Sequence, residues 1–156
     1  MTVDISDLIT PSTIVPSLKV TSKKQALQEL ARHGAESTGL GERAIFEILL
    51  ERERLGTTGV GGGVAIPHGK LPGLTRLYGV FARLETPIDF DSIDEQPVDL
   101  IFLLLAPETA GADHLKALAR VSRSLRDKET CEKLRGSDTA EALYALLTES
   151  PASNAA

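Results

Sequence analysis

Residues 98–106 read VDLIFLLLA and hold the longest apolar run of the chain, residues 100–106. The run does not alternate between polar and apolar side chains, so a strand here would be covered on both of its faces. It is also far shorter than the roughly 18 apolar residues that a membrane span requires. We therefore predict a central, fully covered β-strand at this position and no insertion into a membrane.

Further strands and helices are predicted on both sides of this run. Residues 76–84 (RLYGVFARL) favour a second strand, and residues 86–90 (TPIDF) a short edge strand. Apolar residues at helical spacing predict helices over residues 42–54, 112–127 and 129–134. This order favours an α/β sandwich, a sheet with helices on both faces, formed by a single domain over residues 1–150. Residues 151–156 (PASNAA) are predicted to be a short disordered tail.

Two further helices are predicted from their capping residues. Ser22 followed by Gln25 fits a capping box at the start of the first helix, and Gly34 is expected to end it. The same pattern at Asp138 and Glu141 predicts the start of the last helix.

Composition narrows the class of protein. The 156 residues carry 17 Lys and Arg against 22 Asp and Glu, a net charge of −5 that argues against sequence-independent nucleic-acid binding. Cys131 is the one cysteine, so no intrachain disulfide can form, and the N-terminus lacks the basic and apolar regions of a signal peptide. We expect a cytoplasmic protein with a protein or small-ligand partner.

Residues 57–70 (TTGVGGGVAIPHGK) contain five of the 13 glycines and show no helical period. A short buried strand is predicted over residues 64–66, ended by Pro67, so that His68 would project from a rigid strand end. Gly69 would leave room beside His68 for a large partner. The backbone of Gly61, Gly62 and Gly63 could form a concavity that binds an anion.

Three other side chains are candidates for a functional role. His114 falls in the first turn of the third predicted helix, where a neutral imidazole could donate a hydrogen bond to an anion; alternatively, it is a half-buried residue of an apolar helix face. Arg52 lies at the edge of the apolar arc of its helix, either as an anion ligand or as a surface arginine, and the rest of residues 51–54 is expected to face solvent. His33, just before Gly34, is expected to be structural, favoured by the helix dipole.

Together these groups suit phosphoryl transfer. A neutral His68 can attack phosphorus without a metal, while Arg52, His114 and the Gly61–Gly63 amides could cover the charge on the transferred group. The spacing of Gly63, Gly69 and Lys70 does not fit a P-loop, and the histidines and the cysteine show no zinc spacing. No metal or cofactor is therefore expected.

Residues 55–70 (LGTTGVGGGVAIPHGK) resemble the active-site segment of the phosphotransferase-system enzyme IIA proteins of the fructose, mannitol and nitrogen type. Residues 84–100 (LETPIDFDSIDEQPVDL) resemble the nitrogen-regulatory branch in particular. The resemblance implies a mixed sheet flanked by helices, with His68 as the phosphoryl acceptor and His114 and Arg52 as its site partners. It also implies a histidine phosphocarrier protein as donor, and targets such as sensor kinases or potassium-transport components.

Two alternatives remain open at this point. The chain could be a sugar-specific IIA component that passes its phosphoryl group to a IIB domain. It could also be a binding module whose His68 is never phosphorylated.

Overall fold

Strand β6 (Val98–Pro107) lies at the centre of a six-stranded sheet in the computed structural model, which describes residues 3–149. All of its side chains except that of Asp99 are buried. Leu100, Phe102 and Leu104 join one hydrophobic cluster, and the intervening Ile101, Leu103 and Leu105 join a second cluster on the opposite face. The central strand predicted from residues 98–106 is therefore confirmed. The tail predicted for residues 151–156 lies outside the described residues.

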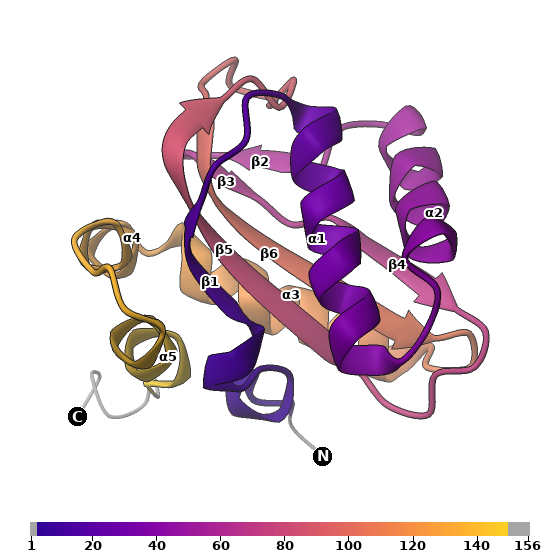
Figure 1. Cartoon of the computed structure of the whole chain (residues 1–156). Coiled ribbons are helices and arrows are strands. Elements are labelled where there is room, and N and C mark those ends of the chain that lie inside the picture. The colour runs from indigo at the N-terminus through magenta and orange to yellow at the C-terminus, as the bar shows by residue number, and fades with distance from the viewer. Residues whose placement is uncertain (1–2, 150–156) are drawn as a thin grey trace.

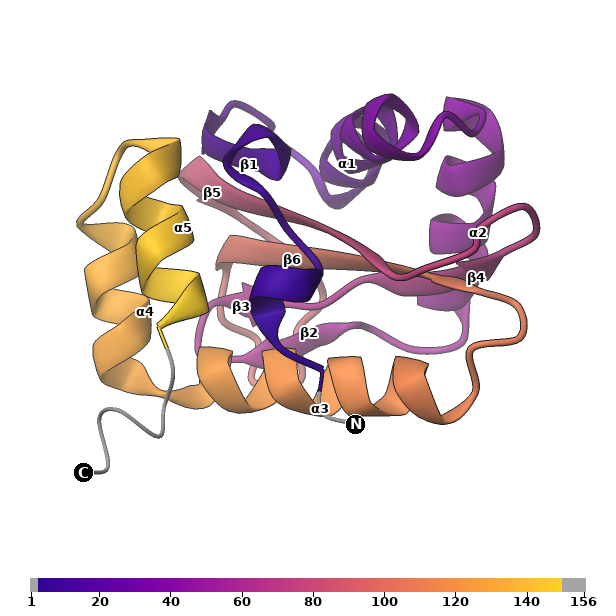
Figure 2. The same ribbon diagram turned by 90° about the horizontal axis from the view of Figure 1, so that it is seen from below.

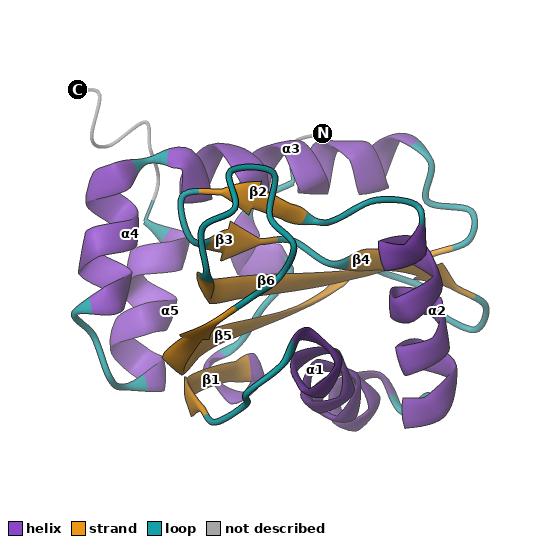
Figure 3. Cartoon of the chain, turned by 90° about the horizontal axis from the view of Figure 1, so that it is seen from above, coloured by secondary structure: helices purple, strands orange, loops and turns teal. Residues whose placement is uncertain are grey.

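The sheet is mixed in direction (Figure 3). Strand β6 pairs antiparallel with β5 on one side and parallel with both β3 and β4 on the other. β1 extends the sheet beyond β5 as a parallel strand, and β2 extends it beyond β3 as an antiparallel one. The bounds are β1 (Ile14–Leu18), β2 (Gly59–Gly61), β3 (Val64–Ala65), β4 (His68–Leu71) and β5 (Tyr78–Ile88).

Helices cover both faces of this sheet, as predicted (Figures 1 and 2). One face carries α1 and α2, and the other carries α3, with α4 and α5 packed into the same hydrophobic cluster. None of the helices within residues 3–149 is both long and apolar enough to cross a membrane. The bounds are α1 (Lys23–Thr38), α2 (Glu42–Arg54), α3 (Ala112–Arg126), α4 (Lys128–Arg135) and α5 (Ala140–Thr148), preceded by the short 3-10 turns η1 (Ile5–Asp7) and η2 (Pro11–Thr13).

Helix α1 does not stop at Gly34 as predicted. It continues to Thr38 and ends at Gly39, whose φ of 78° is the left-handed conformation that caps helices. A Cβ at Gly34 would lie 3.2 Å from Leu105 Cδ1, so this glycine allows the helix to approach β6 closely. His33 therefore lies inside the helix, and the predicted dipole interaction at a helix end is wrong.

Other boundaries also differ from the prediction. Residues 86–88 are not a separate edge strand but the end of β5, and β1 and β4 were not predicted. Strand β1 contains Pro16, which an edge strand tolerates because only one side of it is paired. The last helix is capped by the Thr139 side chain, which accepts from the Ala142 N–H at 3.2 Å, and not by Asp138.

Candidate functional site

Three elements bring His68, Arg52 and His114 together at one end of the sheet. His68 is the first residue of β4, Arg52 lies in the last turn of α2, and His114 lies in the first turn of α3. The Arg52 Nε is 3.4 Å from His68 Nε2, and the rings of His68 and His114 have centroids 5.6 Å apart at an interplanar angle of 51°. A group of phosphoryl size on His68 would lie within reach of both neighbours.

The backbone at His68 is fixed more firmly than a strand end would be. Pro67 interrupts the sheet between β3 and β4, as predicted, but His68 opens a new strand rather than ending one. It pairs in register with Leu104, and the Pro67 carbonyl accepts from the Leu104 N–H at 3.0 Å. The prediction that His68 lies at the end of a strand is therefore wrong. The backbone pairs with β6 both before and after Pro67, which fixes the position from which the ring projects.

Hydrogen bonds fix the tautomer of His68. Its Nδ1 lies 2.9 Å from the carbonyl oxygen of Ile66, which can only accept, so Nδ1 carries the proton. In the neutral ring Nε2 then carries the lone pair, which accepts a hydrogen bond from Arg52 Nε at 3.4 Å. The nucleophilic nitrogen and the cation that could receive a phosphoryl oxygen therefore lie on the same side of the ring.

The surroundings favour the neutral form of both histidines. Burial lowers the pKa of His68 below its ordinary value, and the charge of Arg52 acts in the same direction; the hydrogen bond to Ile66 and the Glu53 carboxylate oppose this shift. Burial also lowers the pKa of His114, supported by the nearby His68 and Lys70. A ring that stays neutral near pH 7 keeps the lone pair that nucleophilic attack needs.

His114 has one polar atom without a partner. The residue is 7% exposed, and among the described residues its Nδ1 forms no hydrogen bond. A buried polar atom without a partner is unusual and marks a place where a further group could bind. Its position beside His68 makes His114 available to a group carried on that ring.

Gly69 has a different role from the one predicted. A Cβ at this position would lie 2.5 Å from Ile48 Cγ2, so the missing side chain accommodates α2 and not an approaching partner. The prediction of open space at Gly69 is wrong. The glycine instead lets the helix that carries Arg52 lie against the strand that carries His68.

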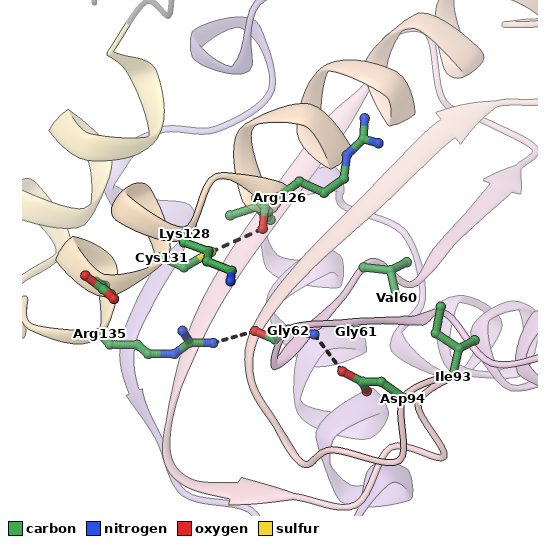
Figure 4. A pocket seen from close by; sticks show the side chains of 11 residues that line it. Val60, Gly61, Gly62, Ile93, Asp94, Arg126, Lys128, Cys131 and Arg135 are labelled. Carbon is green, nitrogen blue, oxygen red and sulfur yellow. Dashed lines mark hydrogen bonds between the residues drawn. The ribbon is translucent and has the colours of Figure 1, made fainter.

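The structure does not bring the glycine triplet to His68. Gly63 lies where β6 begins, because its carbonyl accepts from Asp99 and Leu100, whereas His68 pairs with Leu104. Four to five residues of extended strand separate these points, about 15 Å. Gly61–Gly63 form the turn of the β2–β3 hairpin, with φ values of 100°, 67° and 81°. Figure 4 shows that the Gly62 N–H donates to Asp94 and the Gly62 carbonyl accepts from Arg135.

A pocket of about 540 Å³ lies beside this hairpin. It is lined by Val60, Gly61 and Gly62 together with the side chains of Ile93, Asp94 and residues of α3 and α4 (Figure 4). None of His68, Arg52 and His114 lines it. Within residues 3–149, no group of three or more His, Cys, Asp or Glu side chains is arranged to hold a metal ion.

Sequence analysis missed Glu53, which was expected to face solvent with the rest of residues 51–54. The structure buries it, with only 9% exposed, while its neighbour Arg54 is exposed. Helical spacing gave one signal, since Glu53 follows the buried Leu49 by four residues. Its partners Lys23 and Thr58 lie 30 residues before it and five residues after it, and nothing in the local sequence marks either as a partner.

Two exposed leucines lie close to site residues in the sequence. Leu55 follows α2, three residues after Arg52, and is 82% exposed; Leu115 follows His114 and is 67% exposed.

The fold and the convergence of an imidazole, a second imidazole and a guanidinium define the class of protein. The model of the family described as "Phosphoenolpyruvate-dependent sugar phosphotransferase system, EIIA 2" matches residues 7–150, and the chain belongs to this family. Its similarity is to the nitrogen-regulatory branch, as residues 84–100 predicted.

Three relatives illustrate this similarity. A nitrogen regulatory protein of Bradyrhizobium diazoefficiens is 65% identical over 151 residues, covering 97% of this chain and 99% of that protein. One of Klebsiella oxytoca is 48% identical over 136 residues, covering 86% and 84%. The crystal structure of the nitrogen regulatory protein IIA-Ntr from Neisseria meningitidis has a TM-score of 0.88 at 39% identity, covering 92% of this chain and 99% of that one.

Proposed function

We propose that the protein accepts a phosphoryl group on Nε2 of His68 from the phosphohistidine of a small carrier protein, and that its phosphorylation state signals to regulatory targets. The observation that supports this most is the pair of contacts on the His68 ring. The Ile66 carbonyl accepts from Nδ1 at 2.9 Å and so keeps the proton there, and the unprotonated Nε2 accepts from Arg52 Nε at 3.4 Å.

The transfer follows from this arrangement. The Nε2 lone pair forms a bond to phosphorus while the bond from phosphorus to the donor nitrogen breaks, and the donor imidazole leaves with that electron pair. Arg52 and His114 are proposed to donate to the equatorial oxygens, and the exposed Lys70 adds positive charge nearby. The reaction needs no water, metal or cofactor.

The Ile66 carbonyl has a second consequence. Because it keeps the proton on Nδ1 while Nε2 bonds to phosphorus, the phosphorylated ring becomes positively charged. A cationic imidazole is a better leaving group than a neutral one, so the phosphoryl group stays transferable. This suits a carrier, which must pass the group on or return it.

The donor is proposed to dock over the surface that includes the exposed Leu55 and Leu115, which follow α2 and His114 in the chain. We further propose a cytoplasmic location, where such carriers are found, and targets of the kind the family suggests, such as sensor kinases or potassium-transport components. A phosphoryl group would add charge to this surface and so change which partner it binds. The glycines at positions 61–63 are not part of the proposed phosphate site.

Incubation with phosphoenolpyruvate, enzyme I and the carrier protein tests this function. The wild type should gain one acid-labile, alkali-stable phosphate, and His68→Ala should gain none. His33→Ala is the matched control, since His33 lies on α1 and contacts no site residue; it should be labelled like the wild type. A wild type that takes no label is a binding module, and onward transfer to a IIB domain identifies a sugar-transport component.

A further inference from the structure

Glu53 is a buried carboxylate next to the site. It is the penultimate residue of α2, between Arg52 and the exposed Arg54, and its side chain is 4% exposed. A buried carboxylate is stable only when its charge is compensated and its oxygens accept hydrogen bonds. Lys23 Nζ lies 2.7 Å from Glu53 Oε2, and the Thr58 N–H donates to both carboxylate oxygens at 3.1 and 3.2 Å. The Thr58 hydroxyl donates to Oε1 as well.

A continuous series of hydrogen bonds leads from Glu53 to the His68 ring. Thr58, held by Glu53 through its N–H, accepts through its carbonyl from the Ile66 N–H at 2.9 Å. The Ile66 carbonyl in turn accepts from His68 Nδ1. The position of the carbonyl that selects the His68 tautomer therefore depends on where Thr58 is held.

The second contact of the ring starts from the same turn of α2. Arg52 donates through a terminal nitrogen to the Gly56 carbonyl at 3.0 Å, and the Gly56 N–H donates to the Glu53 carbonyl at 3.1 Å. Arg52 Nε then faces His68 Nε2. Residues 55–58 thus lie between the two groups that hold the ring, and the Glu53 side chain fixes the far end of this segment.

We propose that Glu53, neutralised by Lys23, is a positioning residue that holds Thr58 and Ile66 so that His68 keeps its proton on Nδ1 and presents Nε2 for phosphorylation. This inference rests on the proposed function for its purpose, but the tautomer it predicts can be measured separately. Without the carboxylate, the Ile66 carbonyl is less firmly placed and the ring also populates the form with the proton on Nε2. That form has no lone pair toward the donor.

Glu53→Gln is the direct test, and Glu51→Gln is its matched control. Glu51 is exposed on the same helix and its replacement removes the same charge. Two measurements apply to each variant: nitrogen NMR shifts of the His68 imidazole, and the rate of phosphoryl transfer from the phosphorylated carrier. In Glu53→Gln the Nδ1 and Nε2 shifts should move toward each other, and kcat should fall about tenfold, the usual size of such indirect effects. KM for the carrier should change less than kcat, because neither Leu55 nor Leu115 is replaced.

A double variant distinguishes the positioning role of Glu53 from a general loss of stability. In Glu53→Gln, Lys23 and Thr58 compete for the single amide oxygen. Combining it with Lys23→Met removes this competition and the Lys23 charge beside the amide, so the double variant should fold and recover part of the tautomer preference and of kcat. A folded Glu53→Gln protein with wild-type shifts and wild-type kcat overturns the inference. If the wild type takes no phosphate but Glu53→Gln still changes the tautomer, the positioning role stands and the proposed function is wrong.

Discussion

At the Asp99 end of β6, Arg135 meets a carboxylate and a carbonyl; at the Leu104 end, Arg52 meets a neutral imidazole and a carbonyl. Arg135 lies 2.8 Å from Asp99 Oδ2 and donates to the Gly62 carbonyl at 2.8 Å. Arg52 donates to the Gly56 carbonyl at 3.0 Å and reaches His68 at 3.4 Å. Each end also contains glycines at close contacts, so residue types alone do not distinguish the two regions.

The difference lies in how completely the polar groups are satisfied. The Arg135 charge is balanced by Asp99, whereas Arg52 forms no ion pair within residues 3–149 and the buried His114 Nδ1 has no partner there. A guanidinium without a carboxylate keeps its attraction for an incoming anion, and a paired one does not. The Asp99 end therefore stabilises the hairpin, and the His68 end is left ready for a phosphoryl group.

Replacing each arginine should give the largest difference between the two ends of β6, a loss of rate at one and a loss of stability at the other. Arg52→Ala should slow phosphorylation of His68 about 100-fold, the cost of losing one donor to a charged transition state. Its free energy of unfolding should change by less than about 1 kcal/mol, because a half-exposed surface contact contributes little. Arg135→Ala should cost about 2 kcal/mol of stability, because Asp99 and the Gly62 carbonyl lose their donor.

Quenched phosphorylation time courses and urea denaturation of both variants measure this difference. Arg135→Ala should be phosphorylated at the wild-type rate when assayed where it is folded. Equal slowing in both variants would mean that the two ends of β6 are not separate in function.

Replacing one glycine at each end of β6 by alanine should distinguish the two ends again, with a smaller effect on the phosphorylation rate. In Gly69→Ala the new Cβ meets Ile48, so α2 must shift and carry Arg52 away from His68. We expect a rate about tenfold lower, since small displacements of a charged donor are costly. Gly63→Ala combines a φ of 81° with a contact to the Arg135 guanidinium, and should lower stability by about 2 kcal/mol without changing the rate.

The second-site variant Ile48→Ala provides the control. Combined with Gly69→Ala it makes room for the new methyl group and should return the rate toward that of Ile48→Ala alone. No recovery in the double variant would show that Gly69 acts otherwise than by its contact with α2.

Strong local signals explain what could be predicted from the sequence. Helix α2 was predicted over residues 42–54, the bounds observed, because apolar residues recur at helical spacing and Gly56 follows. Strand β6 was predicted because the short apolar run of residues 98–106 does not alternate, which favours a strand covered on both faces. The chemistry of His68, Arg52 and His114 suggested a shared site and the family resemblance implied one; the local pattern placed each residue on its own element without fixing their distances.

Features that depend on distant partners could not be predicted. Strand β4 is short and has no strand pattern in its four residues, His68–Leu71; its pairing comes from β6. Glu53 reads as one of several charges in residues 51–54, and its burial depends on Lys23 and Thr58. The glycine triplet correctly signalled an unusual backbone, but its anion partner is the Asp94 side chain, 32 residues further along the chain.

The smallest expected effect is the pH dependence of stability that comes from the three histidines. Burial is the first cause of a lowered pKa at His33, His68 and His114, so the unfolded chain binds more protons than the folded one below about pH 6.5. The stability contributed by these neutral rings is fully present above that pH and is lost as the pH falls further. Urea denaturation between pH 8 and pH 5 measures this loss.

The second cause of the lowered pKa differs between His114 and His33. His68 helps to lower the pKa of His114, whereas Arg32 has this effect on His33. In His68→Ala, an NMR titration should therefore find the pKa of His114 closer to its ordinary value and that of His33 unchanged. Because His114 then differs less between the folded and unfolded states, it contributes less to the acid loss of stability. An unchanged His114 pKa would show that the two rings do not interact electrostatically, and a shared phosphoryl site would lose that support.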